Sequence, residues 1–277
     1  MTETGIIGLV LIIANFAFSY KGLKDHTFFD NYKFEVDRIF VSKEYKRLFT
    51  SGFLHVSWLH LILNMFSLFA FSALLESYLG GINFLIIYFS SLLGGNLLAL
   101  FIHRQHADYS AVGASGAVSG IIFACIALFP DLGISLFGLI SIPSWLYGLV
   151  YVIYSIYGIR SKRDNIGHEA HLGGALIGLI IAVMLEPRAF AHNYLSILLI
   201  VTPVLIFIFL IILKPQVLFI DNFYFKSHST YFDIDDQYNE EKVNKQKELD
   251  QLLDKIGQRG IDSLSKKERQ RLDELSR

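Results

Sequence analysis

The sequence has little charge and almost no cysteine. Of its 277 residues, 18% are charged and the mean hydropathy is +0.46, whereas a soluble domain has roughly 25% charged residues. These values argue against a soluble enzyme and a disordered chain. The net charge of -1 provides no field that would attract a nucleic acid. The single cysteine, Cys125, excludes a disulfide framework and multi-cysteine zinc sites, and we expect neither a metal nor a cofactor.

The charge that is present is concentrated near the C-terminal end. Residues 214–277 hold 12 of the 24 Lys and Arg residues and 13 of the 25 Asp and Glu residues. The rest of the chain contains seven uncharged runs, five of which are long enough for a helix across the roughly 30 Å of a bilayer core. Backbone groups in lipid must be satisfied internally, so we expect helices and not strands. The runs are Gly5–Tyr20, Thr50–Leu75, Ser77–Ile102, Tyr109–Pro130, Leu132–Ile159, Ala170–Leu185 and Ala189–Leu213.

Several local signals refine this pattern. No positively charged segment precedes the first run, so it is read as a retained helix and not as a signal peptide. Glycines and a proline within 133–143 predict an interfacial turn, which leaves about 144–159 as the fifth helix. Pro203 predicts a kink in the last run. Residues 237–276 predict either a small amphipathic helical hairpin outside the membrane or a solvated tail.

Three apolar runs contain polar clusters. The second run has His60 and Asn64, which are four residues apart and therefore on one helical face. Ser115 lies near the start of the fourth run, between Gly113 and Gly116, and a cluster of His168, Glu169 and His171 lies at the start of the sixth run. Polar groups within a membrane are costly, so each cluster is a hypothesis for a functional site.

The spacing of small residues suggests that two of these clusters meet. Gly116 with Gly120, and Gly174 with Gly178, form small-xxx-small patterns that let helices pack closely. If the fourth and sixth helices touch there, the hydroxyl of Ser115 and an imidazole lie near the same helix ends, as a nucleophile and its base. The alternative is that each polar group only stabilises its own helix.

The combined pattern resembles the rhomboid intramembrane serine proteases. The resemblance covers roughly residues 5–185 and rests on matching motifs in the expected order. They are Arg47 with the stretch Phe-Thr-Ser-Gly-Phe-Leu-His that begins at Phe49, the spacing from His60 to Asn64, Glu76 followed by Ser-Tyr-Leu-Gly, Gly113-Ala-Ser-Gly, and Ala170-His-Leu-Gly-Gly.

This resemblance implies an all-α fold with a six-helix transmembrane core at residues 1–187. An additional helix at 188–214 and a charged extramembrane tail at 215–277 would follow. Ser115 would be the nucleophile and His171 the general base of a dyad without a carboxylate. The oxyanion hole would comprise His60, Asn64 and the Ser115 amide. Structural support would come from Gly113, Gly116, Gly174, Arg47 and Glu76.

The chain also departs from the family pattern. Ser119 stands where some members place an aromatic ring against the catalytic histidine, so that ring comes from elsewhere or is missing. Lys46 precedes Arg47, where the family often has Trp. Among the other histidines, we expect His55 to be structural and His103 and His106 to be solvated in a polar loop.

The resemblance further implies substrates and a location. The expected partners are single-span membrane proteins with helix-weakening residues, together with the lipid bilayer, and the expected location is the inner membrane of a bacterium. Two arguments about the orientation of the protein in the membrane disagree. Family precedent places the active site away from the cytoplasm. The loops on that side hold 11 Lys and Arg residues, against Arg188 alone on the other side, and the positive-inside rule favours the reverse.

Two alternatives remain at this stage. A catalytically dead relative would bind and route membrane proteins, although such proteins lose the serine or histidine that this chain keeps. A small transporter or channel would use the polar cluster as a path, but it would not require the Gly-x-Ser-Gly turn at the start of a helix.

Overall fold

A computed structural model describes residues 5–136, 140–161, 166–213, 255 and 272. The chain divides into two compact units, residues 1–220 and 221–277. The first unit contains all the elements discussed below. The hairpin expected at 237–276 lies outside the described residues, and the domain boundaries expected from the sequence stay predictions.

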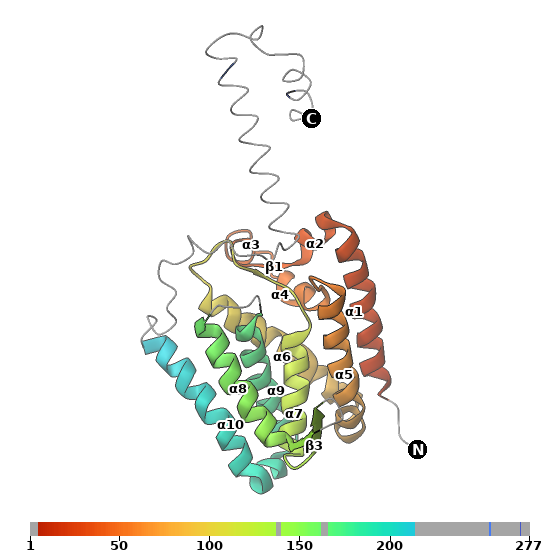
Figure 1. Cartoon of the computed structure of the whole chain (residues 1–277), viewed down its shortest axis with the longest axis vertical. Helices are drawn as coiled ribbons and strands as arrows, with labels where there is room; N and C mark the ends of the chain where they lie inside the picture. The colour runs from red at the N-terminus through yellow and green to blue at the C-terminus, as the bar shows by residue number, and fades with distance from the viewer. Residues whose placement is uncertain (1–4, 137–139, 162–165, 214–254, 256–271, 273–277) are drawn as a thin grey trace. The chain divides into compact units, whose positions relative to one another are not determined.

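The first unit is a helical membrane bundle, as the sequence predicts (Figure 1). Within the described residues, five helices are long and apolar enough to cross a membrane. They are α1 (Ile6–Lys24), α5 (Trp58–Leu79), α6 (Gly81–Ile102), α9 (His168–Leu185) and α10 (Pro187–Leu213). The shorter α7 (Ser115–Leu128) and the less apolar α8 (Ser144–Ser161) complete the bundle.

The lengths of three helices differ from those of the uncharged runs. The first and sixth runs were the short ones, but α1 extends to Lys24 and α9 begins at His168, so polar flanking residues join the helices. The long fourth run gives only the 14 residues of α7. A run without charge indicates an apolar environment and does not give the length of a helix. α7 is apolar because it lies at the centre of the bundle, where all residues from Gly116 to Leu128 are buried.

Glycines let α6, α7 and α9 pack as a tight inner group. A Cβ atom on Gly174 would collide with the backbone of Gly116, and one on Gly178 would collide with the backbone of Gly120. On the other side of α9, a Cβ on Gly173 would lie 2.8 Å from the carbonyl oxygen of Gly94 in α6. The contact between the fourth and sixth predicted helices is therefore present and uses the expected glycines.

Two regions contain strands where the apolar run predicted only helix or turn. β3 (Gly133–Leu136) and β4 (Ile140–Pro143) pair antiparallel before α8 begins at Ser144, so a pair of strands occupies the place of the predicted interfacial turn. A hairpin satisfies its central backbone groups by cross-strand bonds, as a helix does along its axis. The predicted start of the fifth helix at 144 is confirmed.

The segment between α1 and α5 consists of short elements. They are α2 (His26–Tyr32), β1 (Phe34–Glu35), α3 (Val36–Phe40), α4 (Arg47–Thr50) and the 3-10 turn η1 (Ser51–Phe53). β1 pairs with β2 (Ser110–Ala111), which directly precedes the turn into α7. The segment is thus joined to the residues that lead into the candidate nucleophile.

α10 has a break at Asn193, in addition to the kink that the sequence predicts at Pro203. Asn193 has non-helical dihedral angles (φ −114°, ψ 18°). Its side-chain Nδ2 donates to the carbonyl oxygens of Ala127 and Leu128 at 2.9 and 3.3 Å. These are among the last carbonyls of α7, which have no partner inside their own helix. The need to satisfy them explains the distortion at Asn193.

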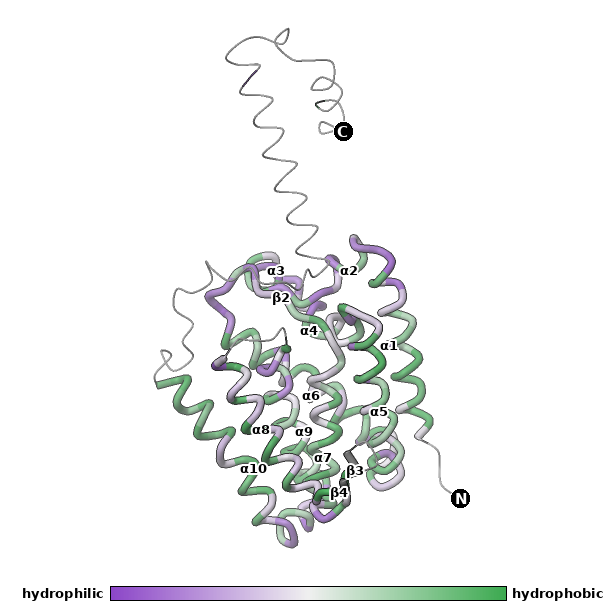
Figure 2. Tube along the Cα trace, viewed as in Figure 1, coloured by the Kyte–Doolittle hydropathy of each residue, from purple (hydrophilic) through white to green (hydrophobic). Residues whose placement is uncertain are grey.

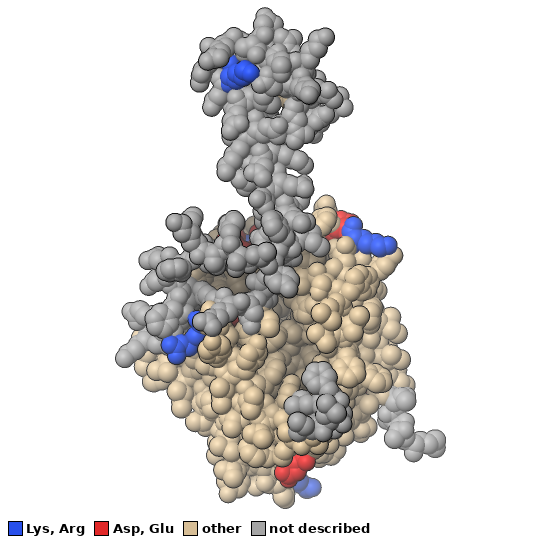
Figure 3. All heavy atoms as spheres, in the orientation of Figure 1, with Lys and Arg blue, Asp and Glu red and all other residues tan. Residues whose placement is uncertain are grey.

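The surface of the described bundle has the polarity of a membrane protein. Figure 2 shows apolar residues along the helices and hydrophilic residues gathered near α2, α3 and β2 at one end and near the hairpin at the other. The visible face in Figure 3 is uncharged over most of the described helices, with charged groups near their ends. The protein is therefore an integral, multi-pass membrane protein.

Candidate active site

Ser115 is the first residue of α7, and that helix end has no side-chain cap. The N-cap residue is Ala114, whose methyl group accepts no hydrogen bond. The first backbone N–H groups of a helix have no partner within it and carry the positive end of the helix dipole. An oxygen that develops negative charge beside Ser115 would meet these donors. Ser115 itself is half-buried, at the edge of a helix that is otherwise buried.

Gly113 brings His60 close to the Ser115 hydroxyl. Its φ of +138° is one that side-chain-bearing residues rarely adopt. A Cβ atom at this position would lie 2.9 Å from Cε1 and 3.1 Å from Nε2 of His60, and 3.6 Å from Oγ of Ser115. The imidazole of α5 and the hydroxyl of α7 therefore lie on either side of one small space, which only a glycine leaves open.

A chain of hydrogen bonds holds the turn before Ser115. The Ser19 Oγ donates its one hydrogen to the carbonyl of Phe53 at 2.8 Å, so it must accept from Nδ1 of His55, also at 2.8 Å. That bond leaves Nε2 of His55 as an acceptor, and the backbone N–H of Ala114 donates to it at 3.4 Å. Burial, with a smaller repulsion from His60, lowers the pKa of His55 to about 3, which keeps the ring neutral.

His171 lies in the first turn of α9, where that helix contacts α7. A Cβ on Gly116 would lie 3.1 Å from the carbonyl oxygen of Ala170. The residue after Ser115 thus touches the residue before His171, and the contact between Gly174 and Gly116 follows one turn later. His171 is half-buried, like Ser115. The two predicted members of the dyad therefore lie at adjoining ends of packed helices.

The aromatic ring beside His171 comes from Tyr151 of α8. The two rings stack with centroids 6.0 Å apart and an interplanar angle of 25°. Ser119 Oγ donates to the carbonyl of Ser115 at 2.7 Å, so it accepts from the Tyr151 hydroxyl at 2.6 Å. Sequence reasoning noticed Ser119 but could not find Tyr151, because an aromatic residue in an apolar run carries no local signal.

Asn64 and His60 differ in their hydrogen bonding. The Asn64 Nδ2 donates to the carbonyl of His60 at 3.0 Å, which engages one of its two hydrogens. Within the described residues, Nδ1 of His60 is buried without a hydrogen-bond partner. Buried polar atoms in native proteins almost always have a partner. The ring edge of His60 that faces the space beside Gly113 and Ser115 is the one with Cε1 and Nε2, so Nε2 is the nitrogen nearer to that space.

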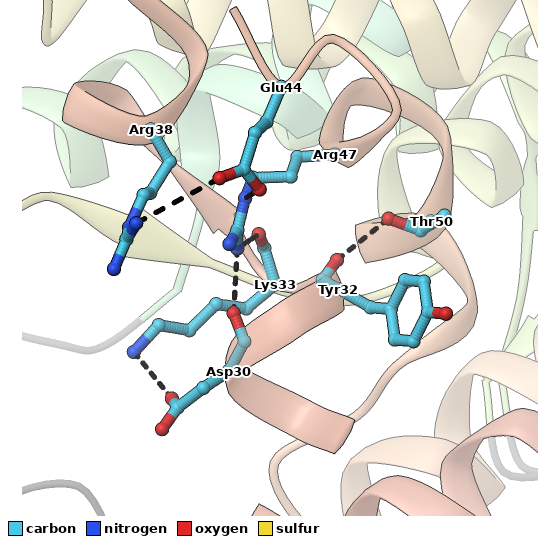
Figure 4. Close-up of polar contacts among 7 residues, drawn as sticks. All are labelled: Asp30, Tyr32, Lys33, Arg38, Glu44, Arg47 and Thr50. Carbon is cyan, nitrogen blue, oxygen red and sulfur yellow. Dashed lines mark hydrogen bonds and ion pairs between the residues drawn. The ribbon is translucent and has the colours of Figure 1, made fainter. Parts of the chain in front are cut away.

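Arg47 and Glu76 make contacts at a distance from the dyad. Figure 4 shows Arg47 among the short elements before α5, with its Nη1 donating to the carbonyls of Asp30 and Lys33 at 2.7 and 2.8 Å. Its Nε donates to Glu44 at 2.8 Å, which lowers the pKa of that carboxyl. The two carboxylate oxygens of Glu76 accept the backbone N–H groups of Ile7 and Gly8, each at 3.0 Å, and so cap α1.

The expectation that His103 is solvated was wrong. His103 is 5% exposed, because its ring stacks on Tyr109 and its Nε2 lies 2.9 Å from Oε1 of Glu169. His106, also expected to be solvated, is half-buried. His168, the other histidine near the dyad, is buried against Gly158 and Tyr154 of α8.

Comparison with known proteins shows the family of the chain. The model of the Rhomboid domain matches residues 42–188, which is more than half of the chain. The chain belongs to the rhomboid family. Residues 232–277 match a second model, a family of unknown function called DUF6576.

Three rhomboid relatives show the extent of the similarity. RHOMBOID-like protein 12, mitochondrial, of Arabidopsis thaliana is 28% identical over 63% of this chain and 56% of its own length. Rhomboid protein 1, mitochondrial, of Saccharomyces cerevisiae is 32% identical over 47% of this chain and 39% of its own. Rhomboid-like protein 11, chloroplastic, of Arabidopsis thaliana is 27% identical over 65% of this chain and 63% of its own length. The chain spans about half the length of the curated relatives it matches.

Proposed function

We propose that this rhomboid is an active serine endopeptidase that cleaves membrane proteins in or near their transmembrane segments. The observation that carries this proposal is the position of Ser115, which stands at an uncapped helix start beside the His60 ring. Gly116, which follows Ser115, contacts Ala170, which precedes His171, so the contact between α7 and α9 brings His171 to the same helix ends. A nucleophile, a base and oxyanion donors are the parts that acyl transfer requires.

The reaction assigns a role to each group. The Ser115 oxygen attacks the substrate carbonyl carbon while its proton passes to His171. The carbonyl oxygen becomes negative and is stabilised by the Ser115 amide, His60 and Asn64. His171 then gives the proton to the leaving nitrogen, the C–N bond breaks, and an acyl ester remains on Ser115. Water repeats the two steps, which releases a carboxylic acid and restores the serine.

The substrate class follows from the location of these groups. A transmembrane helix engages its carbonyls in hydrogen bonds, so a substrate must unwind before attack. Single-span proteins with Gly, Ser or Pro near one membrane face meet this need at low cost. Which cellular membrane holds the protein stays a prediction. The sequence favours the inner membrane of a bacterium, whereas the relatives described above are named for mitochondria and chloroplasts.

A fluorophosphonate probe on the purified full-length protein tests the proposal. We expect labelling of the wild type and its loss in Ser115→Ala and His171→Ala. Ser67→Ala and His192→Ala serve as controls, because among the described residues both side chains bond to carbonyls of their own helices, α5 and α10. A panel of single-span substrates should show the same pattern of cleavage.

The outcome also separates the alternatives. A dead relative would give no labelling and no cleavage while still capturing single-span proteins. A transporter or channel would leave the probe unreacted and would move a solute in vesicles. Labelling that persists in Ser115→Ala would show that another residue reacts and would refute the assigned dyad.

A further inference from the structure

The buried pair of His103 and Glu169 has no role in the chemistry described above. Nε2 of His103 lies 2.9 Å from Oε1 of Glu169, and the two residues are only 5% and 7% exposed. Burial of a carboxylate is costly unless a donor compensates it, and removal of the donor leaves the charge unpaired. A pair at this depth therefore constrains the two segments that carry it.

The His103 side of the pair leads to the nucleophile. His103 caps the C-terminal end of α6, and its ring is stacked on Tyr109 with centroids 3.6 Å apart and an interplanar angle of 6°. Tyr109 adjoins β2, which is paired with β1. After β2 comes Gly113, whose N–H donates to the carbonyl of Ser51 at 3.0 Å. The ring thus contacts the segment that enters the Ser115 turn.

The Glu169 side leads to the base. Glu169 is in the first turn of α9, two residues before His171. Residues two apart on a helix point about 200° apart, so the carboxylate faces away from His171 and is not a third member of the dyad. The contacts of Gly174 and Gly178 lie beyond the first turn of α9, and within that turn the backbone of Ala170 lies against Gly95 and Gly116. Glu169 supplies a fixed point within the first turn.

We propose that the His103–Glu169 pair is a positioning device, which holds the first turn of α9, and with it His171, against the segment that leads into Ser115. This inference rests on the proposed protease function. Neither residue touches the reacting atoms. Both act through the relative placement of the two helix starts, where a shift of about 1 Å can cost roughly 100-fold in rate.

The rate of fluorophosphonate labelling and the kinetics of substrate cleavage test this role in the full-length protein. We expect Glu169→Ala and His103→Ala each to lower labelling and kcat about 10- to 100-fold with little change in KM. The double variant should be no slower than the slower single variant, because the two residues act as one unit. Glu169→Gln should retain more activity, since its amide oxygen still accepts from Nε2.

A matched control and a stability measurement separate positioning from folding. Glu186 follows the last residue of α9, at the opposite end of the same helix. Glu186→Gln should leave kcat unchanged, and the assays are run well below the Tm of each variant. Additive effects of the two single variants, wild-type rates in Glu169→Ala, or a loss confined to KM would overturn the proposal.

A cross-linking measurement tests the geometry without relying on catalysis. Cysteines are placed at positions 115 and 171, and a short bifunctional thiol reagent joins them. We expect the cross-linking yield to fall when Glu169→Ala is added and to stay unchanged with Glu186→Gln. If the wild type does not react with the fluorophosphonate, the proposed function fails, and the cross-link alone decides the positioning role. An unchanged yield in Glu169→Ala refutes it.

Discussion

At the scale of single residues, Tyr151 offers a test of how the base is oriented. Its ring lies against His171, and its hydroxyl is held by Ser119. We expect Tyr151→Leu to slow fluorophosphonate labelling by about tenfold, because the imidazole loses its neighbour. Tyr151→Phe keeps the ring and loses one hydrogen bond of about 1 kcal/mol, so its effect should stay near fivefold or below.

Tyr147→Leu is the matched control for this prediction. Tyr147 lies one turn away in α8, with its ring centroid 6.0 Å from that of Tyr151. The Tyr147→Leu variant should leave the pH dependence of labelling unchanged. Tyr151→Leu should shift that dependence, since His171 then loses the ring that stacks on it. Equal effects of the two leucine variants would assign Tyr151 to packing alone.

His55 predicts a sensitivity to acid. It lies between η1 and α5, and burial lowers its pKa from 6.5 to about 3. Below pH 6.5 the unfolded chain therefore binds a proton on His55 that the folded chain does not, and stability falls as the pH drops from 6.5 toward 3. We expect the fall in Tm between pH 6.5 and 5 to be smaller in His55→Gln than in the wild type.

The exposed His192 of α10 provides the comparison for this measurement. His192→Gln should keep the wild-type dependence of Tm on pH. A His55→Gln variant with the same slope as the wild type would show that the ring is already charged or that it stays neutral when the chain unfolds.

The residue scale also shows how far sequence reasoning reaches. Spacing within one helix identified His60 with Asn64, and the Gly-x-Ser-Gly turn identified Ser115. The glycine patterns also predicted the contact between α7 and α9, whereas polar contacts between distant side chains left no such trace. Glu169 was noticed only as a charge at the start of the sixth run, and its partner 66 residues away in the sequence was assigned to solvent. The packing of the end of α6 against the start of α9 decides this pairing.

At the scale of elements, the glycines of α9 decide whether the dyad can form. A Cβ on Gly174 would collide with the backbone of Gly116, and a backbone cannot yield as a flexible side chain can. We expect Gly174→Ala to destabilise the protein by about 1–3 kcal/mol and to slow labelling as α9 moves away from α7. Thermal unfolding in detergent and the labelling rate measure the two effects.

Gly167→Ala is the control at the same end of the helix. A Cβ there has no neighbour within 4 Å, and the φ of −73° suits any residue. This variant should match the wild type in both measurements. A Gly174→Ala protein with wild-type stability and labelling would show that the helices can separate without consequence for the site.

Element positions were more predictable than element lengths. Each uncharged run contains one helix, because lipid and a protein interior both exclude charge. The runs did not show where a helix stops inside an apolar region. The short α7 and the β3–β4 hairpin depend on surrounding helices, which satisfy or cover backbone groups that lipid would leave exposed.

At the scale of the whole molecule, the charges of residues 21–49, from the last turn of α1 into α4, bear on membrane orientation. Counted singly, the Lys and Arg residues of this segment argue for a cytoplasmic active site. In the structure many of them are already engaged. Arg47 is 3% exposed and bonded to Glu44, Lys33 pairs with Asp30 at 2.9 Å, and Lys21 lies 4.4 Å from the ring centroid of Phe28. We expect a cation that is buried or paired within the protein to weigh less as a topological signal than a fully solvated one.

We therefore expect the active site to face away from the cytoplasm, and cysteine accessibility tests this. Gln105 is exposed in the loop before α7, and Asp131 is exposed in the turn after it, so they mark opposite membrane sides. The native Cys125 is buried and gives little background. In a bacterial host, a membrane-impermeant thiol reagent should label Gln105→Cys in intact spheroplasts and Asp131→Cys only after lysis. The reverse pattern would place the dyad on the cytoplasmic side. The paired Lys and Arg residues would then follow the positive-inside rule despite their contacts.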